Sequence, residues 1–276
     1  IRLGKPLIII FGLGSANGSR TGASPLAEMM ENLTKKPNIS VITCMGNEAN
    51  NKCHYKGTVM SALVPDVMEI NVDGTGKGFT MEIWADSLDI LSVSIESPSG
   101  EYVPRIPARM GASMEYTFLY EGSTVTVDYQ ITENVAGMEV IFVRLKTPVE
   151  GTWKFYIYSL TNIKGSYNAW LPLKQFSGQD IYFLKSDPDT TLTVPAAADG
   201  VISVGAYNHY TGAAYYESGR GYSADGRIKP DFVAPGAVVY GIAPSGGVKV
   251  TGTSLCRWLC CTFIFISGKC KKNSDD

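Results

Sequence analysis

Hydrophobic residues in this chain follow two different patterns. Continuous apolar runs occupy Leu7–Phe11, Ile39–Cys44 and residues 201–206, which is typical of strands buried on both faces of a parallel sheet. After the first run, Ser24 and Pro25 provide an N-cap and a first helical position, and apolar residues then recur at helical spacing. The first 45 residues therefore predict a right-handed βαβ unit with parallel strands.

The pattern changes at about residue 58. Polar and apolar residues now alternate with period two, which is typical of half-solvated antiparallel strands, and clusters of turn residues separate the runs. The expected strands cover residues 79–86, 90–96, 114–120, 124–132, 138–146 and 152–161. Six to eight such strands predict an all-β sandwich of jelly-roll type, inserted into an α/β domain that resumes after Pro195.

The expected fold is thus α/β, with an incomplete parallel sheet, its helices and an inserted β-sandwich. Residues 1–57 form the first part of the α/β domain, 58–187 the insertion, 188–255 the second part, and 256–276 an aberrant tail. The first run begins within a few residues of the N-terminus, without an initiator Met or a signal-peptide pattern. We therefore expect a chain that begins in mid-domain.

Composition narrows the possible partners. The 276 residues carry a formal net charge of −2 and a pI near 5.8, which gives no basic footprint for nucleic acid or for an anionic membrane. The apolar run at residues 261–266 is too short to cross a bilayer. Four of the six cysteines lie in the last 21 residues, and no cysteine spacing matches a zinc site, so no metal is expected.

The glycine-rich loop after the first strand has two possible functions. The spacing of Gly12, Gly14 and Gly18 invites a dinucleotide-binding interpretation. Such a site needs a helix that starts at the glycines and an acidic residue at the end of the next strand. Here the helix starts later and the next strand ends in Met45-Gly46-Asn47, so we expect no cofactor. Aromatic residues in the insertion could likewise form a carbohydrate-binding surface, but core packing is the preferred interpretation for Trp84, Trp153 and Trp170.

A candidate nucleophile lies near the C-terminus. Gly252 and Thr253 place Ser254 at the start of a predicted helix, where backbone N–H groups and the positive end of the helix dipole favour a developing oxyanion. Alone, this tripeptide is weak evidence, because a helix N-cap explains a serine equally well. Two further motifs accompany it: Lys-Pro-Asp-Phe-Val-Ala-Pro-Gly at residues 229–236 and Cys-Met-Gly-Asn-Glu at residues 44–48.

In this order, the three motifs resemble those of the subtilisin-like serine proteases. The resemblance implies peptide-bond hydrolysis through an acyl-enzyme, with Ser254 as nucleophile and with Asn47 and the Ser254 backbone N–H as oxyanion donors. It also implies that Gly12, Leu13 and Gly14 bind the substrate backbone beside the primary specificity pocket, although Gly12 replaces the usual serine. A protein or peptide substrate is implied, and no organic cofactor.

The size and position of the insertion are similar to those of the clostridial Csp germination proteases, in which a jelly roll packs on the catalytic domain. By this resemblance the protein is bacterial and either spore-associated or secreted. The sequence makes no prediction of oligomeric state.

A serine nucleophile also needs a histidine base and a carboxylate. The two histidines, His54 and His209, both lie in segments predicted as polar loops, and neither is in a His-Gly-Thr helix start. In the family, the Asp and His motifs precede the strand with which this chain begins. We therefore expect that both motifs have been lost with the upstream sequence and that this chain alone is inactive. The alternative is a pseudoprotease or protein-binding module, which uses the groove or the sandwich to hold a partner.

The tail after Ser254 departs from the family pattern. Small residues are expected there, yet Arg257 and Trp258 follow shortly after the serine, which conflicts with close helix packing. A shifted reading frame is one explanation, because a one-base shift permits Ala-Ala-Gly after the residue that follows Ser254. The other is a natural short tail with surface cysteines.

Overall fold

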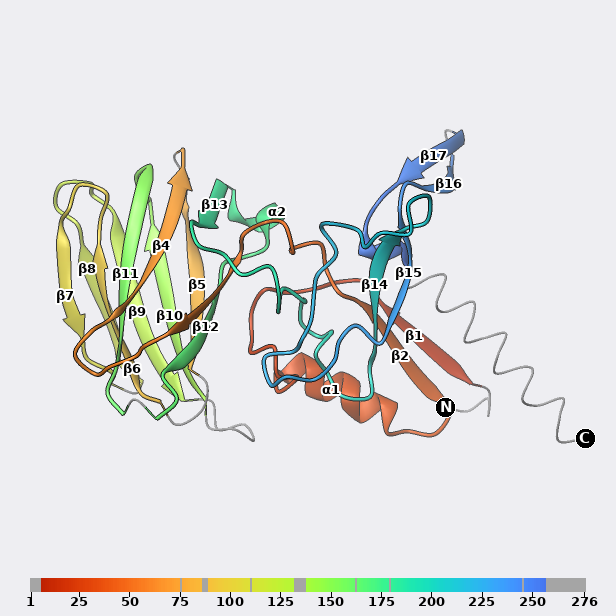
Figure 1. Ribbon diagram of the computed structural model, residues 1–276, viewed down its shortest axis with the longest axis horizontal. Helices are drawn as coiled ribbons and strands as arrows, with labels where there is room; N and C mark the ends of the chain where they lie inside the picture. Colours follow the sequence, from red (N-terminus) through yellow and green to blue (C-terminus); the bar gives the residue numbers. More distant parts are fainter. Residues whose placement is uncertain are drawn as a thin grey trace, which may run out of the picture. The chain divides into compact units, whose positions relative to one another are not determined.

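The computed structural model describes residues 6–74, 76–85, 89–109, 111–131, 138–161, 163–178, 180–244 and 246–256. The chain divides into two compact units, unit 1 with residues 1–50 and 189–276 and unit 2 with residues 51–188 (Figure 1). These divisions lie seven residues before and one residue after the boundaries expected at 57/58 and 187/188. The first difference arises because His54–Thr58 is a strand of unit 2.

Unit 1 is built on a four-stranded parallel sheet. Its strand order is β1 (Leu7–Phe11), β2 (Ile39–Cys44), β14 (Ile202–Asn208) and β15 (Phe232–Ala237). The β1–β2, β2–β14 and β14–β15 pairs are all parallel, so the predicted opening βαβ unit is present. Because β14 lies beside β2, the long insertion interrupts the chain between two neighbouring strands.

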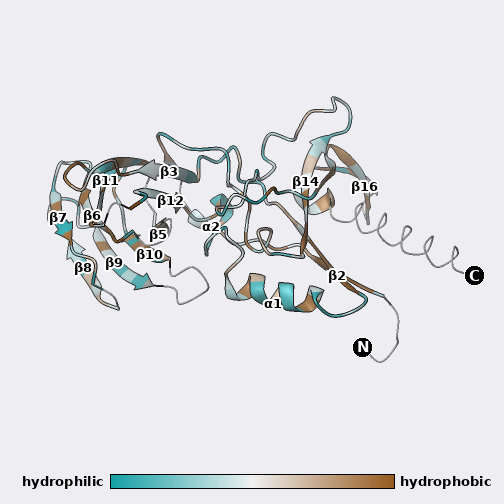
Figure 2. Cartoon of the chain, turned by 60° about the horizontal axis from the view of Figure 1, so that its bottom comes forward, coloured by the Kyte–Doolittle hydropathy of each residue, from teal (hydrophilic) through white to brown (hydrophobic). Residues whose placement is uncertain are grey.

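Helix α1 (Pro25–Thr34) connects β1 to β2. Its start is as predicted: the Ser24 hydroxyl accepts a hydrogen bond from the Ala27 N–H at 3.3 Å, and Pro25 takes a first-turn position where no N–H is needed. The buried residues Ala27 and Met30 pack against Val41 of β2. Figure 2 shows the resulting contrast between the hydrophobic strand β2 and the mixed surface of α1.

The opposite face of the sheet carries a separate small core, which contains Ile42, Val204, Ala206, Ala234 and Cys256. Beyond β15 the chain forms a hairpin of β16 (Val239–Ala243) and β17 (Gly246–Val250). Between β15 and β16, Val238 adopts a φ of 55° and turns the chain. The hairpin leads directly to Gly252 and Ser254.

Unit 2 consists of two antiparallel sheets that share one hydrophobic core. The first sheet has the order β3 (His54–Thr58), β12 (Ser166–Trp170), β5 (Gly78–Ala85), β10 (Glu139–Lys146), β9 (Thr124–Ile131) and β8 (Ser113–Thr117). The second has the order β13 (Asp180–Phe183), β4 (Asp66–Asp73), β11 (Gly151–Ser159), β6 (Leu91–Glu96) and β7 (Tyr102–Ile106). A short helix, α2 (Lys174–Ser177), precedes β13.

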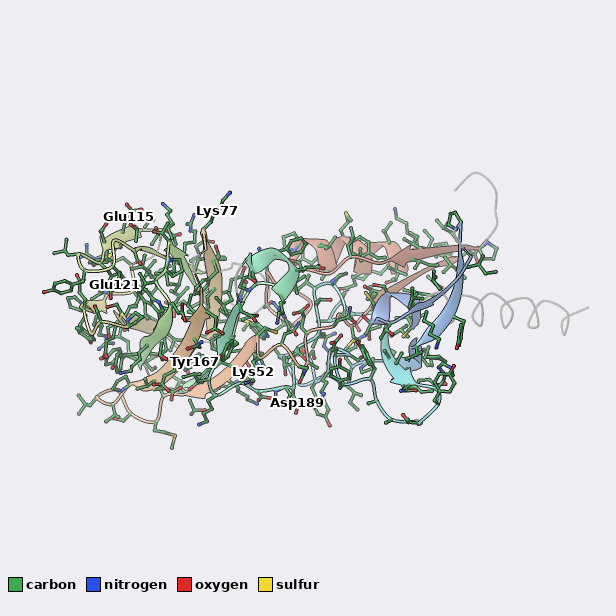
Figure 3. All side chains as sticks on the ribbon, turned by 90° about the horizontal axis from the view of Figure 1, so that it is seen from above. Lys52, Lys77, Glu115, Glu121, Tyr167 and Asp189 are labelled. Atoms are coloured by element: carbon green, nitrogen blue, oxygen red, sulfur yellow. The ribbon has the colours of Figure 1, made fainter. Side chains whose placement is uncertain are left out.

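The period-two pattern located the six expected strands to within a few residues, but the expected total of six to eight was too low. Eleven strands occur in the described part of unit 2. The jelly-roll topology itself stays a prediction. Trp84, Trp153 and Trp170 are all buried, as core packing predicts. In Figure 3 the charged side chain of Lys77 projects outward from unit 2, whereas Tyr167 is fully buried.

No helix in the described ranges is long and apolar enough to cross a membrane.

Candidate functional site

The chain reaches Ser254 through a tight turn that requires glycine. Gly252 has a φ of +144°, a conformation that side chains disfavour, and its N–H donates to the Gly236 carbonyl at 2.8 Å. Residues 253–256 then form the first helical turn, with Thr253 buried and Ser254 half-buried. The Ser254 hydroxyl therefore lies at the start of a helix, as predicted, and it has no hydrogen-bond partner among the described residues.

The turn around Ser254 is supported by the end of β15. The Cys256 thiol donates to the Ala234 carbonyl at 3.2 Å, and burial raises the pKa of this thiol to about 12. A side chain on Gly236 would place its Cβ 2.4 Å from the Cys256 Sγ and 2.7 Å from the Ala206 Cβ. The last glycine of the 229–236 motif is therefore required so that the helix start can approach the sheet.

Asn47 and the turn before Ser254 lie together in unit 1, although 206 positions separate them. The Asn47 Oδ1 accepts hydrogen bonds from the Thr253 N–H at 3.0 Å and from the Thr253 hydroxyl at 3.1 Å. Because a backbone N–H can only donate, these contacts fix the orientation of the carboxamide. Both amide atoms lie near Gly252, because a Cβ there would be 3.6 Å from the Nδ2 and 3.9 Å from the Oδ1.

The predicted substrate segment and the loop that contains Asn47 both pack against Thr193. Leu13 is 72% exposed, whereas a Cβ on Gly14 would lie 2.3 Å from the Thr193 Oγ1. A Cβ on Gly46, next to Asn47, would lie 2.5 Å from the Thr193 Cγ2. Gly14 and Gly46 therefore contact the same threonine side chain. Just beyond, Ser15 forms an antiparallel bridge with Val194 through two hydrogen bonds of 3.0 Å.

Sequence reasoning missed Arg20, which holds this loop in place. Arg20 is 3% exposed, and its guanidinium donates to the carbonyls of Ala16 and Gly18 at 2.5 Å each and to the Leu192 carbonyl at 3.2 Å. In the sequence, Arg20 stands in a loop of Gly, Ser and Asn, where a charged residue is expected to be exposed to solvent. Its burial could not be predicted from its neighbours, because the Leu192 carbonyl that it binds is 172 positions away.

Within the 229–236 motif, Lys229 and Asp231 make structural contacts. The Asp231 carboxylate accepts from the Ser203 N–H and hydroxyl, both at 2.7 Å, and from the Lys229 ammonium at 2.8 Å. Burial alone would raise the pKa of Asp231, but these hydrogen bonds outweigh it and hold the pKa below its usual value. They fix the start of β15 to the start of β14. Asp225 forms an ion pair with Arg227 at 2.8 Å.

The prediction that both histidines lie in polar loops was wrong for His54. His54 is fully buried in β3 of unit 2, where its Nε2 lies 3.0 Å from the Asn168 Oδ1 and its ring stacks on Trp170 at 5.0 Å. His209 lies on an exposed turn after β14 in unit 1, with its ring 4.0 Å from that of Tyr210. The described ranges hold no cluster of three or more His, Cys, Asp or Glu that could bind a metal.

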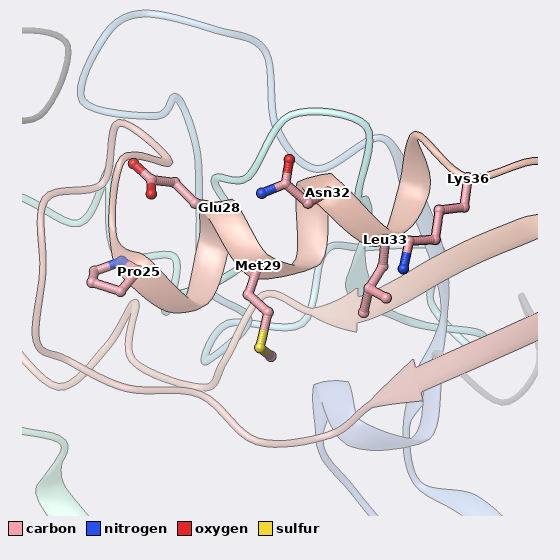
Figure 4. Close-up of a pocket in the computed structure, with 6 residues that line it drawn as sticks. All are labelled: Pro25, Glu28, Met29, Asn32, Leu33 and Lys36. Atoms are coloured by element: carbon pink, nitrogen blue, oxygen red, sulfur yellow. The ribbon is translucent and has the colours of Figure 1, made fainter.

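Two hollows occur on unit 1. One, of about 520 Å³, is lined by the end of β14, residues 211–216, the end of β15 and Thr251, which is three positions before Ser254. The other, of about 410 Å³, runs along one side of α1 (Figure 4). Its lining carries no nucleophile; it consists of Pro25, Glu28, Met29, Asn32, Leu33 and Lys36. Neither hollow is lined by Ser254 or Asn47.

Comparison with known proteins agrees with this geometry. Residues 150–263 match the model of the Subtilase family, a range that includes the 229–236 motif and Ser254. This match and the fold confirm the resemblance to the subtilisin-like serine proteases. The present structure, which contains both parallel and antiparallel sheets, matches that of a subtilase-type protease.

Among solved structures, the chain is similar to the CspB protease of Clostridium perfringens, with a TM-score of 0.86 and 26% sequence identity. The similarity covers 99% of this chain and 57% of that chain, so the present sequence spans less than two thirds of that protein. No match was found among curated proteins. The aberrant tail predicted at 256–276 lies, apart from Cys256, outside the described residues.

Proposed function

We propose that this chain is part of a subtilisin-like serine endopeptidase in which Ser254 is the nucleophile. The observation that carries the proposal is the pair of hydrogen bonds from Thr253 to the Asn47 Oδ1. They hold the carboxamide beside the turn that presents Ser254 and assign its Nδ2 as the donor end. A carboxamide suits this role because it donates without carrying a charge in the ground state.

In the proposed reaction the Ser254 Oγ forms a bond to the carbonyl carbon of a peptide, and a base takes the hydroxyl proton. Asn47 and the Ser254 backbone N–H hold the resulting oxyanion. The C–N bond then breaks, the leaving amine takes the proton from the base, and water hydrolyses the acyl-enzyme. Gly12, Leu13 and Gly14 bind the substrate backbone in this proposal, and the exposed position of Leu13 is compatible with that role.

We also propose that the 276 residues alone do not turn over peptides. Removing the histidine of a serine triad costs roughly a factor of 10⁶ in turnover. Of the two histidines, His54 is buried in unit 2 beside Asn168, and His209 has a ring contact with Tyr210. The base and its carboxylate are therefore expected from sequence upstream of this chain.

The test uses the full-length protein and the 276-residue chain in parallel. The full-length protein should hydrolyse a fluorogenic peptide library and should gain one fluorophosphonate adduct, located by mass spectrometry on Ser254. Ser254→Ala should abolish both, and Asn47→Ala should lower kcat by about 10² to 10³. An adduct on another residue, or full kcat in Asn47→Ala, would refute the proposed site, and turnover by the 276-residue chain would refute its inactivity.

The second candidate function is a pseudoprotease that binds a protein partner. The observation that favours it is the hollow lined in part by Thr251, whose lining includes neither Ser254 nor Asn47, so that binding there would not need the catalytic residues. A full-length protein that binds peptides but neither hydrolyses them nor reacts with the fluorophosphonate would support this function over the first.

A further inference from the structure

Two loops of unit 2 leave the sandwich together at one end. The antiparallel pairing of β3 with β12 continues beyond both strands, since the Val59 N–H donates to the Gly165 carbonyl at 2.8 Å. Residues 60–65 follow Val59, and residues 163 and 164 precede Gly165. The two segments therefore extend side by side from the end of the sheet.

These loops expose five large apolar side chains, which we call the apolar tip. Its members are Met60, Leu63, Val64, Leu160 and Ile163. Their exposed fractions range from 59% for Leu160 to 89% for Leu63. Single exposed apolar residues are common on proteins, but a group of them on adjoining loops indicates a surface that binds another apolar phase or molecule.

A buried carboxylate holds the second loop in position. Asp89 is 2% exposed, and its oxygens accept hydrogen bonds from the N–H groups of residues 163, 164 and 165 at 2.7, 2.9 and 2.7 Å. In the first loop, the Leu63 N–H donates to the Ser61 hydroxyl at 3.1 Å. Because an N–H without a partner is costly in an apolar phase, loops whose donors are paired in this way suit entry into the interface of a lipid bilayer.

Positive charge borders the apolar tip. Lys164 belongs to the second loop, and Lys56 lies two residues before the end of β3. Both lysines are exposed, and neither forms an ion pair within the ranges that the structure describes. The carboxylate of Asp66, at the start of β4, instead accepts from two tyrosine hydroxyls at 2.8 and 3.0 Å. The net charge of −2 does not indicate this local pattern, because it averages over the whole chain.

We propose that the apolar tip docks unit 2 on the surface of an anionic lipid bilayer. The apolar side chains enter the interface, and Lys56 and Lys164 contact lipid phosphate groups. The residue types favour lipid over a protein partner, because Trp, Tyr and Arg dominate binding between proteins, whereas Leu and Val are under-represented there. The apolar tip contains only aliphatic side chains and a methionine. This proposal does not depend on the chemistry of Ser254.

The test measures binding of the full-length protein to vesicles by co-sedimentation. The vesicles contain either phosphatidylcholine mixed with phosphatidylglycerol or phosphatidylcholine alone. The wild type should bind the mixed vesicles more tightly, and this difference should shrink as ionic strength rises, because salt screens the attraction. Lys56→Gln and Lys164→Gln should each weaken binding to the mixed vesicles about fivefold.

A double variant, Leu63→Asn with Ile163→Asn, tests the apolar contribution. It should weaken binding to both kinds of vesicle by more than about tenfold, since two apolar side chains no longer leave water. Leu119→Asn is the matched control and should bind as the wild type does. Leu119 is 84% exposed but lies in the turn between β8 and β9, which strand pairing places at the opposite end of the sheet. All three side chains are exposed, so the variants should unfold at the wild-type temperature, which circular dichroism checks.

Four results would overturn the proposal. They are no binding of the wild type to either kind of vesicle, equal affinity for both kinds, wild-type binding by the double variant, and an equal loss in Leu119→Asn. If vesicles are not bound and the wild type forms a dimer that the double variant does not form in sedimentation equilibrium, a second copy of the chain covers the apolar tip instead. None of these results bears on the protease proposal, which the fluorophosphonate reaction tests separately.

Discussion

Asn47 has two separable functions in this geometry, and substitutions can distinguish them. Its Oδ1 accepts from the N–H and hydroxyl of Thr253, which is fully buried, while its Nδ2 is the proposed oxyanion donor. Asn47→Ala removes both functions. Asn47→Asp keeps an acceptor for Thr253 but removes the proposed oxyanion donor. This variant should therefore preserve the fold and lose catalytic activity.

The expected stability change follows from the two hydrogen bonds. Each bond contributes about 1 kcal/mol, and leaving a buried donor without a partner adds about 1 to 3 kcal/mol. Asn47→Ala should therefore lower the free energy of unfolding by roughly 3 to 5 kcal/mol, a large part of the 5 to 15 kcal/mol that is typical of a whole domain. Asn47→Asp should lose less than about 1 kcal/mol above pH 6, where the carboxylate is ionised.

Urea unfolding of the three proteins, followed by far-UV circular dichroism and tryptophan fluorescence, measures these differences. Since the tryptophans of known position lie in unit 2 and Asn47 lies in unit 1, the circular dichroism signal is the primary readout. Both variants should lose kcat in the full-length protein. An Asn47→Asp variant as unstable as Asn47→Ala would refute the assigned amide orientation, and an Asn47→Ala variant as stable as the wild type would refute the contact with Thr253.

Three further predictions concern buried charged groups. Arg20→Ala should lower the free energy of unfolding, measured in urea, by about 2 to 4 kcal/mol, because three carbonyls lose a charged donor. Arg20→Lys should restore less than half of this loss, since an ammonium lacks the planar arrangement of donors in a guanidinium. An Arg20→Lys variant as stable as the wild type would contradict the role of these three hydrogen bonds. Burial would raise the pKa of Asp89, but N–H groups of residues 163–165 outweigh it and lower the pKa. The contribution of ionised Asp89 to the free energy of unfolding should therefore be present above about pH 4 and be lost as the pH falls further. An Asp89→Asn variant whose free energy of unfolding changes with pH as steeply as that of the wild type in this range would contradict this prediction. Burial raises the pKa of Glu139 to about 7, so stability should fall by up to about 3 kcal/mol as pH rises from 4.5 to 7; Glu139→Gln should remove this fall, and an unchanged pH profile would refute it.

Local patterns predicted the elements whose cause is local. The apolar runs at β1, β2 and β14 and the Ser24-Pro25 helix start all depend on neighbours within a few residues, and each forms where it was expected. The period-two strands of unit 2 also formed as predicted, because alternation alone determines which side of a strand is buried. Gly252 and Thr253 also place Ser254 at the start of a helix, as expected.

Long-range contacts account for what the sequence did not predict. His54 reads as a loop residue because its neighbours are Cys, Tyr and Lys, but Asn168 and Trp170, more than 100 positions away, provide its hydrogen bond and stacking partner. Arg20 is buried by a carbonyl from Leu192 for the same reason. No pattern within a window of 11 to 18 residues contains this information.

The hydrogen bonds at the ends of the insertion explain how the chain accommodates a second unit between Asn47 and Ser254. In unit 1 the chain leaves after Ala49, whose N–H donates to the Glu217 carbonyl at 3.2 Å, and after its return the Leu192 N–H donates to the Arg220 carbonyl at 3.2 Å. Both connections are thus fixed to one short segment, whose Gly219 N–H donates to the Gly46 carbonyl at 2.8 Å. In unit 2 the ends are paired as well, since the Asp187 N–H donates to the His54 carbonyl at 2.9 Å. Because the entropy of closing a loop grows only slowly with its length, ends held this close tolerate an insertion of this size. The geometry around Asn47 is therefore set by hydrogen bonds within unit 1 and does not depend on the topology of unit 2.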